Sequence, residues 1–395
     1  MRARSYAFGP PRFLGVFAHP DDETFCAGGT LAKYTAAGAE AMVVSATRGD
    51  AGQIRDARVA TRRTLGQVRE RELMLACERL GVQQVRCLDY GDGTLKDIAQ
   101  ETLIRDVTEI IRMFHPDVVI TFGEDGAYGH PDHIAISTST TAACTRAGDA
   151  TQFPEQIATG LAAHKPTFLY YSHFPRSRML LLERLVQWLV SSDQRFRGTP
   201  EFIRALLLLC EETSMLGYTS DHVAVEWYPP GFYVVEQGEP SAKLYLIMSG
   251  EAQAIQEDAS GTLHPLGRLG PGMFFGELGI ANRGPRSAHV VAQESMTCLV
   301  FSPGQPTLFA GRGTSADERL ARVAGGLDEF LPTGATNCID VNAYVERKIA
   351  AVAAHRSQYP IEPDMLPLPM LQEMIGREYF VRVLPKRELD SDLLG

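Results

Sequence analysis

The sequence predicts an α/β fold: a Rossmann-like parallel sheet with helices on both faces, plus an inserted antiparallel β-roll with flanking helices. In the first 175 residues, short apolar runs without alternation separate helix-like segments, as expected of parallel strands buried on both faces. From about Glu212 the pattern changes to alternating segments between Pro- and Gly-containing turns, which is typical of antiparallel strands. After Pro303 helical segments return, so α/β-like sequence lies on both sides of the β-rich part.

The individual elements follow from these patterns. Apolar runs rich in β-branched residues predict strands at Phe13–Ala18, Ala41–Ala46 and Asp117–Phe122. Helical periodicity and the terminating Gly81 predict helices at Thr24–Ala37 and Val68–Leu80. In the closing part we expect a helix at Ala316–Leu331, a strand at Thr336–Val341, a helix at Asn342–His355 and a strand at Glu378–Leu384. Strand–helix alternation of this kind places ligands at the carboxyl ends of the strands.

Composition limits the classes of function. The 395 residues carry a net charge of −10, a length that suits two domains and a charge that argues against a nucleic-acid partner. No apolar tract approaches the roughly 20 residues of a membrane span, so we expect no membrane segment. Seven cysteines without a CxxC pair suit reduced thiols and a cytoplasmic protein. A homo-oligomer is compatible with all of this.

Two short motifs carry metal-binding chemistry. His19-Pro20-Asp21-Asp22-Glu23 follows the first predicted strand, and Tyr128 to His133 (YGHPDH) follows the strand at Asp117–Phe122. Both motifs lie where this fold places sites, so they can face one cleft. Catalytic zinc takes three protein ligands and keeps one position for water. Two imidazoles and a carboxylate meet that need, and a second carboxylate can take a proton from the water.

The same segments resemble the LmbE-like, or PIG-L, deacetylases, which hydrolyse N-acetyl groups, often on glucosamine derivatives. The resemblance rests on AHPDDE from Ala18, TRG from Thr47, VRE from Val68 and GHPDH from Gly129, in the order of that family. It implies one zinc ion per chain and a small N-acylated substrate. The implied roles are zinc ligands His19, Asp22 and His133, general base Asp21, oxyanion stabiliser His130 as imidazolium, its orienting partner Asp132, a second donor Tyr128, and sugar contacts Arg69 and Asp92.

A second motif lies in the β-rich part. Gly272 to Ile280 (GMFFGELGI) is a glycine-bearing turn that can expose backbone N–H groups, and an arginine follows at Arg286. Such a turn can hold a phosphate. Together with Tyr228 to Gly250, it resembles the cyclic-nucleotide-binding domain of the bacterial cAMP-receptor type. The resemblance implies that cAMP is bound by Gly276, Glu277, Leu278, Arg286, Ser287 and Ala288.

The order of the motifs predicts a nested arrangement. Segments from Ile339, from Ala354 and from Gly376 resemble the closing part of the PIG-L deacetylases, so the hydrolase resumes after the nucleotide-binding module. We expect a discontinuous hydrolase at 1–190 and 333–395, and an inserted module at 191–332. The helix at Ala316–Leu331 would then link cAMP binding to the metal cleft.

Two other functions compete with a cAMP-regulated deacetylase. The first is a cyclic-nucleotide sensor whose inactive hydrolase part only scaffolds a partner. The second is a non-haem iron oxygenase, because two histidines and one carboxylate also hold that metal. The additional Asp21 and His130 favour hydrolysis over both alternatives.

Overall fold

The computed structural model describes residues 9–173, 185–186, 188–191, 196–211, 223–302, 335–385 and 392–394. The chain divides into two compact units. The first unit comprises Met1–Phe174, Thr333–Asp364 and Ile375–Gly395, and the second comprises Pro175–Pro332 and Met365–Met374. The predicted domain bounds, 1–190 with 333–395 and 191–332, remain a proposal. The helix predicted at Ala316–Leu331 lies outside the described residues.

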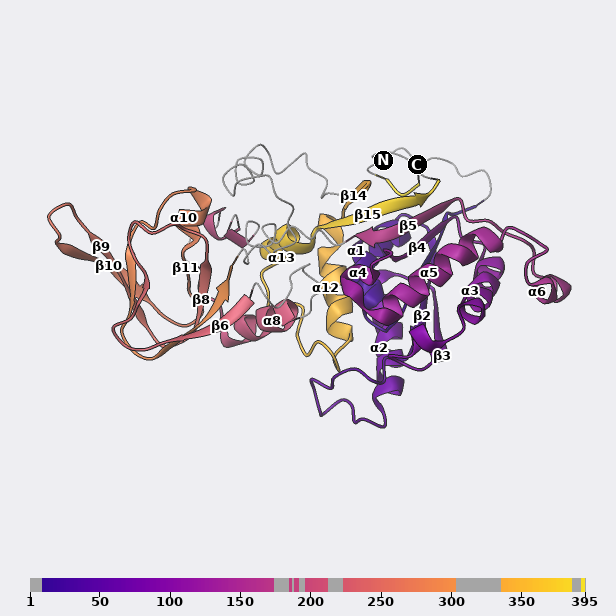
Figure 1. The fold of residues 1–395 in the computed structure, drawn as a ribbon, viewed down its shortest axis with the longest axis horizontal. Helices are drawn as coiled ribbons and strands as arrows, with labels where there is room; N and C mark the ends of the chain where they lie inside the picture. Colours follow the sequence, from indigo (N-terminus) through magenta and orange to yellow (C-terminus); the bar gives the residue numbers. More distant parts are fainter. Residues whose placement is uncertain are drawn as a thin grey trace. The chain divides into compact units, whose positions relative to one another are not determined.

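The first unit is built on a seven-stranded sheet of order β14-β15-β5-β4-β1-β2-β3 (Figure 1). The neighbouring strands among β1 to β5 pair in parallel, whereas β15 pairs antiparallel with both β5 and β14. The central strands are almost completely buried, which explains their apolar runs without alternation. The strands are β1 (Arg12–Phe17), β2 (Glu40–Thr47), β3 (Gln84–Tyr90), β4 (Val118–Phe122), β5 (Phe168–His173), β14 (Asn337–Asp340) and β15 (Arg377–Leu384).

Helices cover both faces of this sheet (Figure 1). α1, α2 and α12 pack on one another, and α3 packs on α5. Gly81 adopts a left-handed conformation (φ 78°) at the end of α2, as its position in the sequence predicts. The helices are α1 (Asp22–Ala36), α2 (Leu65–Leu80), η1 (Leu95–Asp97), α3 (Gln100–Phe114), α4 (Gly126–Gly129), α5 (Pro131–Arg146), α6 (Pro154–Ala158), η3 (Asn342–Tyr344) and α12 (Val345–Ala354).

The second unit contains two four-stranded sheets, of order β10-β9-β12-β7 and β11-β8-β13-β6. All the strand pairs in them are antiparallel, and their inward side chains form one apolar core. The elements are α8 (Pro200–Glu211), β6 (Val223–Tyr228), β7 (Tyr233–Val235), β8 (Leu244–Ser249), β9 (Ala252–Glu257), β10 (Leu263–Leu269), β11 (Phe274–Phe275), α10 (Glu277–Ala281), β12 (His289–Ala292), β13 (Met296–Phe301) and α13 (Leu368–Ile375).

The predicted fold class is confirmed in both parts: a mostly parallel sheet between helices and an antiparallel β-roll. The predicted helix at Asn342–His355 begins with a 3₁₀ turn, and its α-helical part is Val345–Ala354. Among the described helices, none combines the length and the apolar character that crossing a membrane requires.

Candidate functional site

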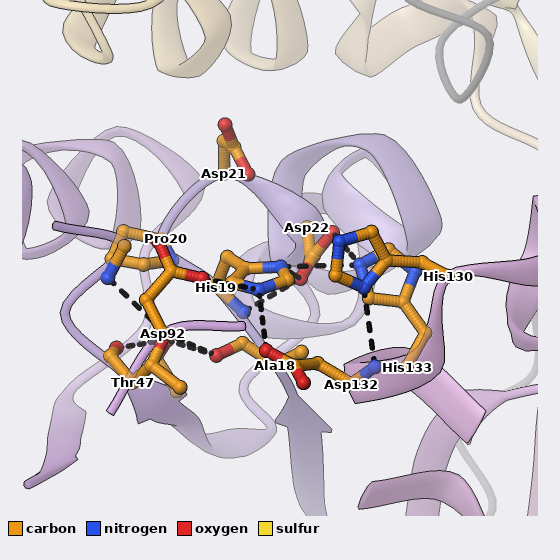
Figure 2. Close-up of polar contacts among 12 residues, drawn as sticks. Ala18, His19, Pro20, Asp21, Asp22, Thr47, Asp92, His130, Asp132 and His133 are labelled. Atoms are coloured by element: carbon orange, nitrogen blue, oxygen red, sulfur yellow. Dashed lines mark hydrogen bonds and ion pairs between the residues drawn. The ribbon is translucent and has the colours of Figure 1, made fainter. Parts of the chain in front are cut away.

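The topology brings the two histidine motifs to one edge of the sheet. β1 and β4 are neighbouring parallel strands, so their carboxyl ends lie side by side. His19 follows β1, and His133 lies in the first turn of α5, which follows β4. Asp92 reaches the same edge from the loop after β3. Figure 2 shows these side chains converging.

Three predicted ligands lie at the spacing of a metal site. His19 Nδ1 is 3.2 Å from His133 Nε2, and Asp22 places one carboxylate oxygen 3.5 Å from the first atom and the other 3.4 Å from the second. Ligands at about 2.0–2.1 Å from a tetrahedral zinc ion are separated by about 3.3–3.4 Å. The types of donor fit zinc, and each imidazole nitrogen has its own Asp22 oxygen at about this separation. Among the described residues, two further groups bring single donor atoms within 4.8 Å of one another: His19, His130 and His133, and His19, Asp92 and Asp132.

The second ring nitrogen of each imidazole also lies close to an oxygen acceptor. His19 Nε2 lies 3.1 Å from Asp92 Oδ1 and 3.4 Å from Asp132 Oδ2, and His133 Nδ1 lies 3.2 Å from the carbonyl oxygen of Gly126. If these outer nitrogens carry the protons, the inner nitrogens present lone pairs to a cation. His133 also stacks on Phe122, with the ring centroids 4.0 Å apart, which fixes the ring plane.

Asp21 stands apart from Asp22, as their adjacency in the sequence predicts (Figure 2). Arg69 binds it: one guanidinium nitrogen donates to Asp21 Oδ2 at 2.9 Å and to the carbonyl oxygen of Pro20 at 2.5 Å. The Asp21 side chain is 13% exposed, whereas the Arg69 side chain is only 5% exposed. In this structure the guanidinium of Arg69 is occupied with the loop of Asp21, and its predicted contact with a sugar remains a proposal.

His130 and Asp132 meet at the start of α5. His130 is the N-cap residue, and its Nδ1 accepts the backbone N–H of Asp132 at 3.2 Å. A neutral His130 ring would then carry its proton on Nε2. The Asp132 carboxylate accepts the backbone N–H groups of Gly93 and Leu95 at 2.7 and 3.0 Å. These hydrogen bonds also hold the loop that carries Asp92 in place. The side chain of Tyr128 lies outside the described residues.

The glycine turn of the second unit is built around Arg286. Its guanidinium is buried and donates to the carbonyl oxygens of Gly276 and Lys243 at 2.9 and 2.6 Å. Gly276 has φ 97°, which favours glycine, and a Cβ atom there would lie 2.5 Å from the guanidinium. The other predicted nucleotide contacts share this turn: Glu277 and Leu278 begin α10, and Ser287 and Ala288 lead into β12.

Two family models match the chain, one in each unit. The model of the PIG-L family, described as GlcNAc-PI de-N-acetylase, matches residues 14–144, and that of the cyclic nucleotide-binding domain matches residues 225–305. The chain carries a PIG-L domain and a cyclic nucleotide-binding domain. The candidate metal ligands lie in the first of these domains and the Arg286 turn in the second.

The PIG-L part of the chain is similar to several known proteins. A 1D-myo-inositol 2-acetamido-2-deoxy-alpha-D-glucopyranoside deacetylase of Rhodococcus jostii is 37% identical over 166 residues, 36% of this chain and 56% of that protein. A Saccharopolyspora erythraea protein with the same name, numbered 1, is 35% identical over 189 residues, 39% of this chain and 62% of that protein. The solved N,N'-diacetylchitobiose deacetylase of Pyrococcus horikoshii aligns with a TM-score of 0.37 and 24% identity, covering 40% of this chain and 59% of that one. The chain spans less than two thirds of each of these proteins.

The two adjacent carboxylates of the PIG-L site differ in pKa. Burial raises the pKa of Asp21 to about 7, although Arg69 opposes this shift. Burial would also raise the pKa of Asp22, but His133 and His19 outweigh it and lower that pKa to about 2. Asp22 therefore stays a carboxylate, as a cation ligand must, while Asp21 can exchange a proton near neutral pH.

The pKa values of the three histidines are shifted in opposite directions. Burial lowers the pKa of His133 to about 4 and also lowers the pKa of His130, which disfavours the imidazolium form predicted for His130 from the sequence. Burial alone would lower the pKa of His19, but the carboxylates of Asp132, Asp22 and Asp92 raise it well above its usual value. A cation placed among these groups would compete with that proton on His19.

Two residues of this region were not singled out in the sequence analysis. Glu23 and His355 form a buried pair behind Asp21, with 2.7 Å between Glu23 Oε1 and His355 Nε2. The signal was present, because Glu23 ends the AHPDDE motif and His355 lies in the segment from Ala354. No spacing rule joins residues that are 332 positions apart, so only the fold reveals the pair.

Proposed function

We propose that the PIG-L domain is a zinc-dependent deacetylase that hydrolyses the N-acetyl amide of a small molecule such as an N-acetylglucosamine derivative. The mutual spacing of His19 Nδ1, His133 Nε2 and the Asp22 carboxylate, 3.2–3.5 Å, carries this proposal. The names of the curated relatives, deacetylases of an acetamido sugar linked to inositol, support the choice of substrate class.

Different residues of the chain carry out the separate steps of the hydrolysis. When bound, a zinc ion would acidify a water molecule and polarise the amide carbonyl. Asp21 takes a proton from the attacking water at Oδ1, because Arg69 binds Oδ2, and returns it to the nitrogen of the leaving amine. His130 donates a hydrogen bond from Nε2–H to the developing oxyanion. The bond broken is the amide C–N bond, and the products are acetate and a free amine.

The test combines metal content with turnover. The full chain, loaded with zinc, should release free amine from a panel of N-acetylated sugars that includes the inositol glycoside named for the relatives. Asp21→Asn should keep one zinc ion per chain and the native circular dichroism while losing turnover by about 10²–10⁴-fold. Asp50→Asn, which changes an exposed carboxylate of a nearby loop, is the matched control and should retain wild-type turnover.

Each alternative predicts a different result. A scaffold with an inactive hydrolase part would release no amine from any substrate, and Asp21→Asn would change nothing. An oxygenase would consume oxygen when loaded with ferrous iron under controlled air and would release no acetate. Wild-type turnover in Asp21→Asn would contradict the role of this carboxylate as the base.

We further propose that the cyclic nucleotide-binding domain binds cAMP and that this binding alters deacetylation. Arg286 supports the binding: its buried guanidinium donates to the carbonyl oxygen of Gly276 in the glycine turn and carries the positive charge that a cyclic phosphate requires. Regulation requires that cAMP bind two conformations unequally, and the sequence that leads back into the PIG-L domain is the suggested route.

A further inference from the structure

The backbone of Asp21 is held in an unusual conformation. Its φ of 119° and ψ of −29° lie in a region that non-glycine residues rarely adopt. Asp21 is the N-cap of α1, yet its side chain makes no capping hydrogen bond and is left for Arg69. Such a conformation persists only where the surroundings fix it.

Glu23 supplies one of the contacts that fix this conformation. Its Oε2 accepts the backbone N–H of Asp21 at 2.9 Å, and its Oε1 accepts the hydroxyl of Thr24 at 2.5 Å. The Glu23 side chain is 1% exposed, and a buried carboxylate needs a charged or strongly donating partner. His355 is that partner, at 2.7 Å from Oε1.

His355 is itself fixed at the end of α12. Its ring is fully buried. Its backbone N–H donates to the carbonyl oxygen of Val352, and its carbonyl oxygen accepts the backbone N–H groups of Gln358 and Tyr359 at 2.9 and 2.7 Å. The carboxylate of Glu23 therefore has little freedom to leave the N–H of Asp21. On the other side of Asp21, Arg69 binds the preceding carbonyl and the carboxylate.

We propose that Glu23 and His355 are positioning residues for the deacetylation, acting through Asp21: the pair holds the Asp21 backbone so that its carboxylate faces the attacking water. The inference rests on the proposed function of Asp21 as the base. A displacement of about 1 Å in a reacting group can cost about 10²-fold in rate, so the pair should control kcat. A contact that only capped α1 would affect stability alone.

The kinetic test compares Glu23→Ala with Glu23→Gln. Alanine removes the acceptor for the Asp21 N–H and should lower kcat by about 10²-fold with KM changed less than twofold. Glutamine retains an acceptor oxygen and a donor for a neutral His355, so it should recover most of the loss. In the Asp21→Asn background, Glu23→Ala should add no further loss of kcat, because it acts through a base that is already absent. Additive losses, or wild-type kcat in Glu23→Ala, would overturn the proposal.

The matched control is Glu72→Ala. Glu72 is another buried carboxylate that holds the same C-terminal segment, accepting the N–H and hydroxyl of Ser357 at 2.7 and 2.6 Å. This change should lower the melting temperature as much as Glu23→Ala but leave kcat within twofold of wild type. If Glu23→Ala does not fold, His355→Gln and His355→Phe give the same comparison, since only glutamine can still donate to Glu23.

A readout that does not depend on turnover separates this proposal from the proposed function. A crystal structure of zinc-loaded Glu23→Ala should show the φ of Asp21 relaxed to negative values and its carboxylate displaced, with zinc retained. An Asp21 that keeps its φ and its contact with Arg69 would refute the positioning role, even if no substrate of the wild-type chain were found. Absence of turnover in the wild type would instead count against the deacetylase proposal.

Discussion

At the scale of single residues, His19 contacts candidate site residues through both of its ring nitrogens. One ring nitrogen faces His133 and Asp22, and the other faces Asp92 and Asp132. The two sides of the imidazole therefore have different tasks: the inner side suits a cation, and the outer side fixes the ring and its proton.

Asp92→Ala should weaken zinc binding by about 10–100-fold, because the His19 ring loses its 3.1 Å partner at Nε2. The measurement is zinc affinity by competition with a chromophoric chelator. Asp89→Ala is the control, since Asp89 lies near the end of β3, just before the loop of Asp92, and its side chain is 84% exposed. Equal zinc affinity in Asp92→Ala and wild type would instead favour a contact of Asp92 with substrate alone.

The Glu23–His355 pair should make the free energy of unfolding depend on pH. Burial would lower the pKa of His355, but Glu23 and Asp21 outweigh burial and Arg69 and raise it. A raised folded-state pKa means that this stabilisation is fully present below the unfolded value, about 6.5, and is lost as pH rises through the folded value. In metal-free protein, His355→Gln should therefore cost more free energy of unfolding at pH 6 than at pH 9. Urea unfolding followed by circular dichroism measures both; equal costs at the two pH values would contradict the assignment.

At the scale of elements, Glu378 ties β15 to two helices. Its carboxylate accepts the backbone N–H groups of Gly29 and Thr30 in α1 at 2.8 Å each, and Lys348 of α12 donates to it at 2.6 Å. Gly29 allows Val341 and Glu378 to approach the helix, because a Cβ atom there would lie 2.6 Å from a methyl group of Val341 and 3.1 Å from Glu378 Oε1. The segments that contain Lys348 and Glu378 are thus part of the core of the first unit.

Lys348→Met should destabilise the first unit by about 3–5 kcal/mol, because it leaves the buried Glu378 without its cation. Chemical denaturation measures the loss. Glu40→Gln is the control: it breaks the exposed pair of Arg12 and Glu40 and should cost about 1 kcal/mol or less. A similar cost for both changes would mean that the Lys348–Glu378 pair is not desolvated in solution.

At the scale of the whole molecule, the chain joins two units of different chemistry, and Arg286 is the residue that tests their coupling. Arg286→Ala should weaken cAMP binding by about 10–100-fold, since a hydrogen bond to a charged group contributes about 1.5–3 kcal/mol. Arg283→Ala, on an exposed position of the same loop, should bind normally. Calorimetry of the full chain gives both affinities.

The same variants test regulation. If cAMP and substrate are coupled by about 1–3 kcal/mol, saturating cAMP should change kcat/KM by about 5–150-fold in wild type and in Arg283→Ala. At the same cAMP concentration Arg286→Ala should respond less. Identical kinetics with and without bound cAMP would remove the regulatory proposal and leave the deacetylase proposal intact.

Much of the fold could be predicted from local patterns. The buried strands β1, β2 and β4 follow from apolar runs, and the end of α2 follows from Gly81, because strand burial and helix termination depend on nearby residues. The 3₁₀ start of the helix after Asn342 was missed, since 3₁₀ and α turns share the same short-range pattern.

The sequence by itself determined the two domain types, the identity of the candidate ligands and their location after parallel strands. Only the tertiary structure decided which atoms face one another: His19 Nδ1 toward His133 Nε2, and Glu23 toward His355 from 332 positions away. Side-chain direction depends on strand order, register and packing, which are set by contacts between distant segments. A motif names the chemical groups that are present, whereas their distances follow from how the whole chain packs.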